Sequence, residues 1–180
     1  MPQRKGRIGR PAASSRVTLE EAAGELALEQ GWDAIAVSEI AARAGVSRSS
    51  FFNYFTAKSD VLWSTFDEAA RDSGSLVDVV ARLQESGPPA ALTHAEAMGA
   101  QNAIAETALS RARRLLPLIA PHARDAGERI RAEMRALGVV LVVADWAADG
   151  VTRGDLGERM DAVLGTAWRG GNPPVTPTAS

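Results

Sequence analysis

A chain of 180 residues is long enough for one or two small domains with a buried core, and the absence of cysteine excludes disulfides and thiolate metal sites. Few aromatic residues and no stretch of strand-like alternation favour closely packed helices over a sheet. No apolar run is long enough to span a membrane, and the basic N-terminus lacks the apolar stretch of a signal peptide. We therefore expect an all-α, cytoplasmic protein.

The formal net charge of −2 conceals an uneven distribution. Residues 1–16 carry five basic side chains and no acidic one, whereas residues 17–60 carry three basic and seven acidic side chains. Residues 1–14 are too rich in Arg, Gly, Pro and Ser to fold alone, so we expect a disordered basic arm. Such an arm can enter the minor groove of DNA, but a solubilising terminus has the same composition. Both roles remain open.

The first predicted helix runs to about Gln30, with Gly31 as its stop signal. Four apolar residues at helical spacing are expected on its inner face: Leu19, Ala22, Ala23 and Leu26.

Two short helices joined by a tight turn are predicted next. The first begins near Val37 and carries a narrow apolar stripe of Ile40, Ala41 and Ala44. Gly45 follows the last periodic residue, where a left-handed conformation commonly ends a helix. The pattern indicates the first half of a helix-turn-helix.

The second helix of this pair is expected to begin after Ser47, a good N-cap, and to run to about Phe55. Phe51 and Phe55 are four residues apart and can be buried against the preceding helix. The opposite side is polar, with small hydroxyl groups near the start that allow close approach to base edges. Its members are Arg48, Ser49, Ser50, Asn53 and Tyr54.

Roughly residues 15 to 66 resemble the DNA-binding domain of the tetracycline-repressor (TetR) family of bacterial transcription regulators. The matching residues are Ile40-Ala41, Ala44-Gly45-Val46-Ser47, Phe51-Phe52, Tyr54-Phe55, Lys58 and Leu62. The resemblance implies a three-helix helix-turn-helix domain over residues 15–57 and a helical effector-binding and dimerisation domain over residues 58–169. The tail, residues 170–180, is expected to be disordered.

The resemblance also implies roles for individual residues. Base contacts map to Ser38, Arg48, Ser49 and Ser50, and phosphate contacts map to Arg16, Ser47, Asn53, Tyr54 and Lys58. Three positions depart from the family pattern: Ile35-Ala36 replaces a common Thr, Phe52 replaces a Tyr, and Ala57 replaces a Ser. By the resemblance, each change removes a hydroxyl group that could bond to a phosphate.

Further helices are predicted from near Lys58 to Asp72, over Leu76 to Leu83, within Ala90 to Leu116, and over residues 125–149 and 154–168. Val139 to Val143 would place apolar side chains all round their helix, which a partner helix from a second subunit could cover. A homodimer is therefore expected. Its interface would contain Leu137, Val140, Leu141, Ala144, Leu156, Met160, Val163 and Leu164.

A pocket for a small effector is implied by the resemblance alone. Its candidate lining combines large apolar groups with a few polar ones, and ordinary core packing is the alternative role for each. These candidates are Trp63, Phe66, Met98, Gln101, Asn102 and His122.

Two other functions compete with a ligand-responsive repressor that binds a palindromic operator. An enzyme would need a catalytic constellation, but the only histidines, His94 and His122, are far apart in sequence and have no carboxylate at i±4 to make a ligand pair. We expect no catalytic residue, cofactor or metal. A DNA-binding regulator that lacks small-molecule sensing, architectural or partner-controlled, would not need the long segment after residue 66. The unidentified effector, DNA and a second copy are the expected partners, and a membrane is not.

Overall fold

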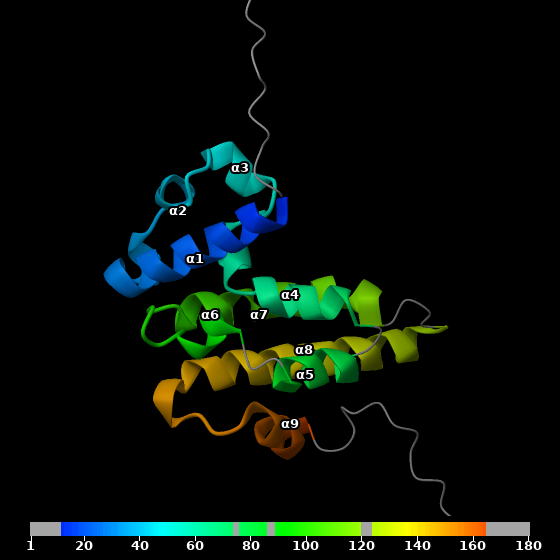
Figure 1. Cartoon of the computed structure of the whole chain (residues 1–180). Helices are drawn as coiled ribbons and strands as arrows, with labels where there is room; N and C mark the ends of the chain where they lie inside the picture. The colour runs from blue at the N-terminus through cyan, green and yellow to red at the C-terminus, as the bar shows by residue number, and fades with distance from the viewer. Residues whose placement is uncertain (1–11, 74–75, 86–88, 120–123, 165–180) are drawn as a thin grey trace, which may run out of the picture.

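The computed structural model describes residues 12–73, 76–85, 89–119 and 124–164, and every regular element in these ranges is helical. The predicted all-α class is therefore confirmed. Figure 1 shows α1, α2 and α3 grouped at one end of the molecule, with the later helices stacked beneath them. The elements are α1 (Ala12–Gln30), η1 (Trp32–Ala34), α2 (Val37–Arg43), α3 (Arg48–Phe52), η2 (Lys58–Val61), α4 (Ser64–Arg71), α5 (Leu76–Glu85), α6 (Ala90–Thr93), α7 (Gln101–Ile119), α8 (Ala126–Ala148), η3 (Gly150–Thr152) and α9 (Leu156–Leu164).

The N-terminal domain is a three-helix unit whose turns follow from two glycines. Gly31 ends α1 with φ 85°, and Gly45 turns the chain between α2 and α3 with φ 69°. Both lie in the left-handed region that glycine adopts at low cost. The four residues predicted on the inner face of α1 are buried, and so are Ile40 and Phe51. The helix-turn-helix therefore forms where the sequence predicts it.

The fourth helix differs from the prediction of one continuous helix beginning near Lys58. A 3₁₀ turn, η2, comes first, and the regular α4 begins only at Ser64, after Trp63 has left helical geometry with φ −102° and ψ 2°. The recognition helix α3 is likewise shorter than predicted, because it ends at Phe52 rather than near Phe55.

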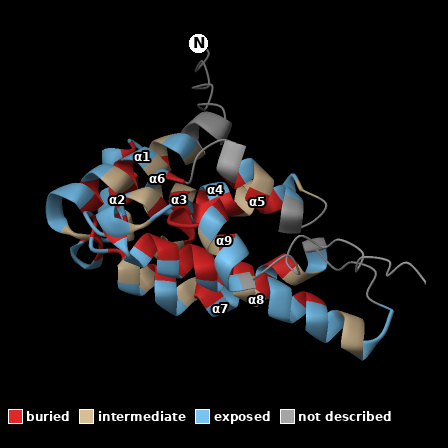
Figure 2. Ribbon diagram, turned by 90° about the horizontal axis from the view of Figure 1, so that it is seen from below, coloured by how far each residue is buried: buried red, intermediate tan, exposed pale blue. Residues whose placement is uncertain are grey.

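Helices α7 and α8 form the most extensive helix pair of the C-terminal domain. Pro117 lies inside α7 rather than ending it, close to the last residue of the helix. Figure 2 shows that one end of α8 projects beyond its neighbours and is largely exposed, while the other end is covered. Val139, Val140 and Val143 in the covered half are fully buried within this single chain.

The turn between α8 and α9 is fixed by a contact with the segment that follows α6. Gly150 has φ 58°, and a β-carbon added to it would fall 1.7 Å from Glu96 Oε2. That same oxygen accepts a hydrogen bond from the Val151 amide at 3.1 Å. The carboxylate of Glu96 therefore occupies the space where a side chain at position 150 would lie.

Candidate nucleic-acid interface

The recognition helix α3 is held in place by its apolar side. Phe51 is fully buried and lies 5.2 Å from Phe55 between ring centroids. At the start of α3, Ser47 Oγ accepts a hydrogen bond from the Ser50 amide at 3.1 Å, as predicted for an N-cap. The same oxygen lies 2.8 Å from the hydroxyl oxygens of Ser49 and Ser50. The three hydroxyls thus form one hydrogen-bonded cluster at the leading edge of the helix.

The predicted base-contacting residues lie together at the surface of α2 and α3. Ser38, Arg48 and Ser49 are exposed, and Ser50 is partly buried. The Arg48 guanidinium lies 5.3 Å from the centroid of the half-exposed Phe52 ring, and no carboxylate of the described residues pairs with it. Figure 1 places α2 and α3 at the end of the molecule that is farthest from α8 and α9.

The predicted phosphate-contacting residues divide into two groups. Ser47 and Asn53 are exposed and Tyr54 is partly buried, close to the base-contacting set in sequence. Lys58, in contrast, donates hydrogen bonds from Nζ to the carbonyl oxygens of Trp32 at 2.7 Å and Ile35 at 3.0 Å. Its ammonium also lies 4.7 Å from the Trp32 ring centroid. Burial lowers the pKa of Lys58, with Asp33 opposing that effect.

Arg16 is also committed to contacts inside the molecule. Its Nε lies 3.0 Å from Glu20 Oε1 and 3.1 Å from Glu68 Oε1, and its Nη2 donates to Ser64 Oγ at 2.7 Å. The guanidinium therefore ties α1 to α4. The structure thus shows Arg16 and Lys58 binding protein groups, so a phosphate contact by either would have to replace or share these bonds.

A polar junction between η2, α4 and α7 was not predicted from the sequence, and Asp60 lies at its centre. Its Oδ2 accepts hydrogen bonds from the amides of Thr56 at 2.9 Å and Ala57 at 3.0 Å. Its Oδ1 accepts from Arg111 Nη2 at 2.9 Å and Arg114 Nη1 at 3.0 Å. One carboxylate therefore fixes the loop after the recognition helix and holds that loop to α7.

Arg111 completes this junction from inside the protein. Its side chain is 2% exposed, pairs with Asp67 as well as Asp60, and lies 5.7 Å from the Trp63 ring centroid. Trp63 in turn donates from Nε1 to Thr107 Oγ1 at 2.8 Å. Arg111 Nε has no hydrogen-bond partner among the described residues. The sequence held a signal for the burial of Arg111, because position 111 lies at helical spacing with the apolar residues Ile104, Ala108 and Leu115 on α7.

The pKa values of the two carboxylates around Arg111 are shifted in opposite directions. Burial acts to raise the pKa of Asp60, but the Ala57 amide and the guanidinium groups of Arg114 and Arg111 outweigh it, so the pKa is lowered. The pKa of Asp67 is raised because burial there outweighs the opposing effect of Arg111. Asp60 is therefore the firmly ionised partner in the junction.

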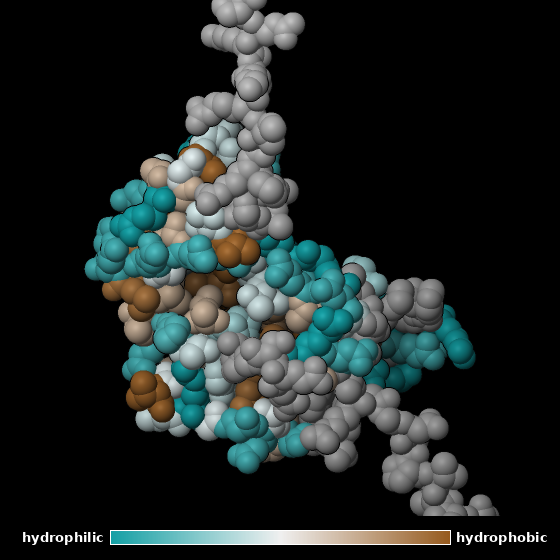
Figure 3. Space-filling view, viewed as in Figure 1, coloured by the Kyte–Doolittle hydropathy of each residue, from teal (hydrophilic) through white to brown (hydrophobic). Residues whose placement is uncertain are grey.

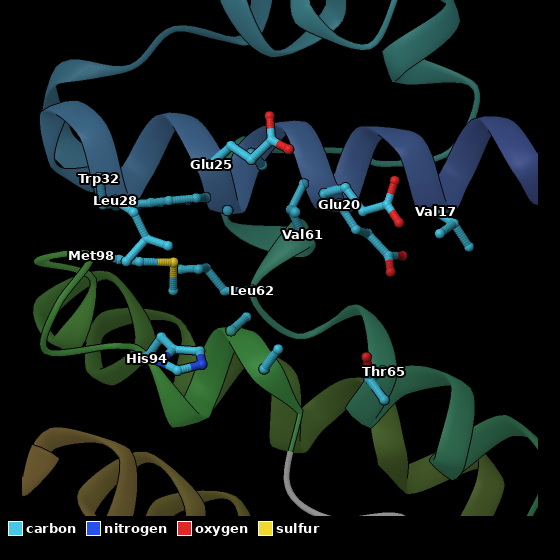
Figure 4. Close-up of a pocket in the computed structure, with 15 residues that line it drawn as sticks. Val17, Glu20, Glu25, Leu28, Trp32, Val61, Leu62, Thr65, His94 and Met98 are labelled. Carbon is cyan, nitrogen blue, oxygen red and sulfur yellow. The ribbon is translucent and has the colours of Figure 1, made fainter. Parts of the chain in front are cut away.

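The described residues predicted to form an effector pocket do not line one cavity. Trp63 and Phe66 are fully buried and pack edge to face, 5.5 Å apart between ring centroids. Gln101 is partly buried, Asn102 is exposed, and His122 lies outside the described residues. Of the five that are described, only Met98 lines the cavity of about 400 Å³ between α1 and α6. Figure 4 shows Met98 in this cavity together with His94.

The residues predicted for a dimer interface also separate into two sets. Val140, Ala144, Leu156 and Met160 are buried in the core of the single chain. Leu137 is partly buried, while Leu141 is 48% exposed and Val163 is 62% exposed. Leu164 ends α9, and its side chain lies outside the described part. Only the second set has apolar surface left for a partner.

No helix in the described ranges is long and apolar enough to cross a membrane.

Comparison with known proteins points to the same N-terminal segment as the geometry. Residues 19–63 match the family described as bacterial regulatory proteins, tetR family. No curated protein matches the chain. The match covers the inner face of α1, the whole helix-turn-helix and η2. With its exposed recognition helix inside this match, the N-terminal domain is a DNA-binding domain of the tetR-family type, and the chain is a DNA-binding transcriptional regulator.

Proposed function

We propose that the chain is a cytoplasmic, homodimeric repressor that binds a palindromic operator and is released by a small effector. The proposal that the chain recognises a DNA sequence is supported by the polar, exposed surface of α3. Arg48 has no carboxylate partner among the described residues, and the small hydroxyl groups beside it leave room for a base edge. An arginine in this setting can bind guanine O6 and N7 together. Ser38 and Ser49 would make the neighbouring base contacts.

The proposed phosphate contacts rest on Ser47, Asn53 and Tyr54, which surround the base-reading surface. For Lys58 and Arg16 we propose mainly a positioning role. Lys58 fixes the turn after α1 through two carbonyl oxygens, and Arg16 fixes α1 against α4. Because the Lys58 bonds hold η2 to the segment before α2 and the Arg16 bonds hold α1 to α4, their loss would weaken binding to every DNA sequence alike.

Replacing Arg48 with alanine is expected to cost about 1–3 kcal/mol of operator binding and to relax the preference at one base pair per half-site. The operator is first obtained by selection from a random duplex library, and binding is then measured by fluorescence anisotropy. Arg43→Ala is the matched control, since Arg43 is exposed on α2 but paired with Glu25 and Glu29. An equal loss of affinity for operator and random DNA would rule out base reading by Arg48.

The dimer is proposed to form through the projecting half of α8. Ile130 and Met134 are 53% and 67% exposed, and Leu137 and Leu141 continue the same stripe at helical spacing. Leu109 on α7 is 49% exposed and helps line a shallow groove with Ile130 and Met134. An apolar stripe of this kind marks a protein interface. A two-fold axis would make the stripe self-complementary and place two recognition helices about 34–36 Å apart.

Met134→Asp is expected to shift the chain to monomer while leaving its helical content unchanged. A charge in the centre of the interface costs about 2 kcal/mol or more of association free energy. Val17→Asp is the control, because Val17 is similarly apolar and 51% exposed but lies on α1. Sedimentation equilibrium measures the result. If Met134→Asp dimerises as tightly as the unaltered chain, the subunits pair through another surface.

A further inference from the structure

A half-open cavity of about 400 Å³ lies between the two domains. One wall is α1 of the N-terminal domain, and the opposite wall is α6 with the segment that follows it. Figure 4 shows Leu28 and Val61 on one side and His94 on the other, with Met98 and Leu62 between them. Figure 3 shows the hollow as a hydrophobic surface between more hydrophilic regions. The volume is in the range of small-molecule sites.

The cavity is apolar inside and acidic at its edge. Most of its lining is aliphatic or aromatic, and its floor includes Trp32 and Leu62, both nearly inaccessible to solvent. Three carboxylates, Glu20, Glu21 and Glu25, belong to the lining, whereas no lysine or arginine of the described residues does. An anionic ligand would therefore meet carboxylates without a compensating cation in the lining.

The three carboxylates are not equivalent. Glu20 is paired with Arg16 across one turn of α1, and Glu25 lies 3.3 Å from Arg43 and points away from the cavity (Figure 4). Glu21 is exposed and has no ion pair or hydrogen bond with the described residues. It is the carboxylate free to receive a positive charge from a ligand.

We propose that this interdomain cavity binds a small amphiphilic cation, with its apolar body against Leu28, Leu62 and Met98 and its charge at Glu21. Of the described residues predicted for an effector pocket, this site contains only Met98. The inference rests on the proposed repressor function only for its effect on DNA. A ligand that contacts α1 and α6 together would favour one spacing between the domains. A difference in affinity for two spacings is what allows an effector to shift DNA binding.

Gly24 offers a way to close the cavity without disturbing the fold. It lines the cavity from within α1, and a β-carbon added there meets no atom within 4 Å. Gly24→Leu would place an apolar side chain in the open space, and removal of a glycine from a helix interior favours the helix. Gly24→Ala is the matched control, because it gains the same helix propensity with little added volume.

The test uses the full chain and decylamine, which is protonated at neutral pH, with decanol and decanoate as probes of equal length. Isothermal titration calorimetry is expected to give the order decylamine, then decanol, then decanoate. Gly24→Leu should weaken decylamine binding more than tenfold, and Gly24→Ala should not. Glu21→Gln should weaken it about two- to fivefold, as for a partly exposed ion pair, while Glu106→Gln on α7 leaves it unchanged.

Equal affinity for the three probes, or undiminished binding to Gly24→Leu, would overturn the site. The proposal would also be overturned if decylamine affinity rose tenfold on replacement of Arg4, Lys5, Arg7 and Arg10 with serine. That result would show that the basic N-terminal segment itself occupies the cavity. A second experiment measures DNA binding with the selected operator. Decylamine should lower the operator affinity of Gly24→Ala but not that of Gly24→Leu. If no operator can be selected, the proposed repressor function is wrong, whereas the calorimetric experiment still tests the ligand site independently.

Discussion

Val140→Asp is expected to unfold the chain rather than to separate subunits. Val140 is fully buried within the single chain, in the half of α8 that neighbouring helices cover. An aspartate there would lie within the hydrophobic core, and burial of an unpaired charge costs several kcal/mol. A loss of about 4 kcal/mol or more is a large part of the ~5–15 kcal/mol that stabilises a typical domain. Circular dichroism at increasing urea concentration measures it.

The neighbouring residue provides the control for this substitution. Leu141 is 48% exposed, so Leu141→Asp should change the free energy of unfolding by no more than about 0.5 kcal/mol. It lies on the stripe proposed for the dimer and should weaken association instead. A folded, helical monomer carrying Val140→Asp would show that Val140 belongs to a subunit interface and not to the core.

Arg111→Met is expected to destabilise the chain by about 3–5 kcal/mol at neutral pH, as for one partner removed from a buried ion pair. The substitution removes a cation from between Asp60 and Asp67, both of which interact with it directly. Asp60 would keep Arg114 and two backbone amides. Asp67 would lose its only ion pair among the described residues. Arg113→Met, on the exposed side of the same helix, should have little effect.

The effect of Arg111→Met should shrink as the pH falls. The lowered pKa of Asp60 stabilises the fold above the ordinary carboxyl pKa of about 4, and this stabilisation is lost as pH falls through the folded-state pKa. Without Arg111 both pKa values rise, so protonation relieves the unpaired charges of the variant. Urea titrations should therefore give a smaller difference in the free energy of unfolding between the unaltered chain and the variant near pH 4 than at pH 7. A loss of stability independent of pH would show that Arg111 acts through packing alone.

Several helix ends in the N-terminal domain were predictable because they have a local cause, whereas the end of α3 at Phe52 was not predicted. Gly31 and Gly45 end helices through their own backbone conformations, and Ser47 caps α3 through its own hydroxyl. Burial of Phe51 follows from its spacing to Phe55 and the polar opposite face. These features depend on residues within one or two turns of each other, which is the range that a sequence pattern describes.

The partners of charged residues were not predictable, because they come from distant parts of the chain. Lys58 is bonded to carbonyl oxygens more than twenty residues away, and Asp60 is bonded to side chains about fifty residues away. A backbone carbonyl leaves no trace in the sequence as a lysine partner. The same limit explains the apolar half of α8, since the sequence shows that it must be covered but not whether this chain or a second copy covers it.

The contact between Gly150 and Glu96 constrains how related sequences can diverge. A side chain at position 150 would meet both a left-handed backbone, with φ 58°, and the Glu96 carboxylate. Loss of the glycine alone is therefore a change that selection should remove, whereas loss together with a shorter residue at position 96 relieves the collision and leaves only the backbone strain. Two positions that are far apart in sequence are thus tied in their evolutionary history, and they should change as a pair.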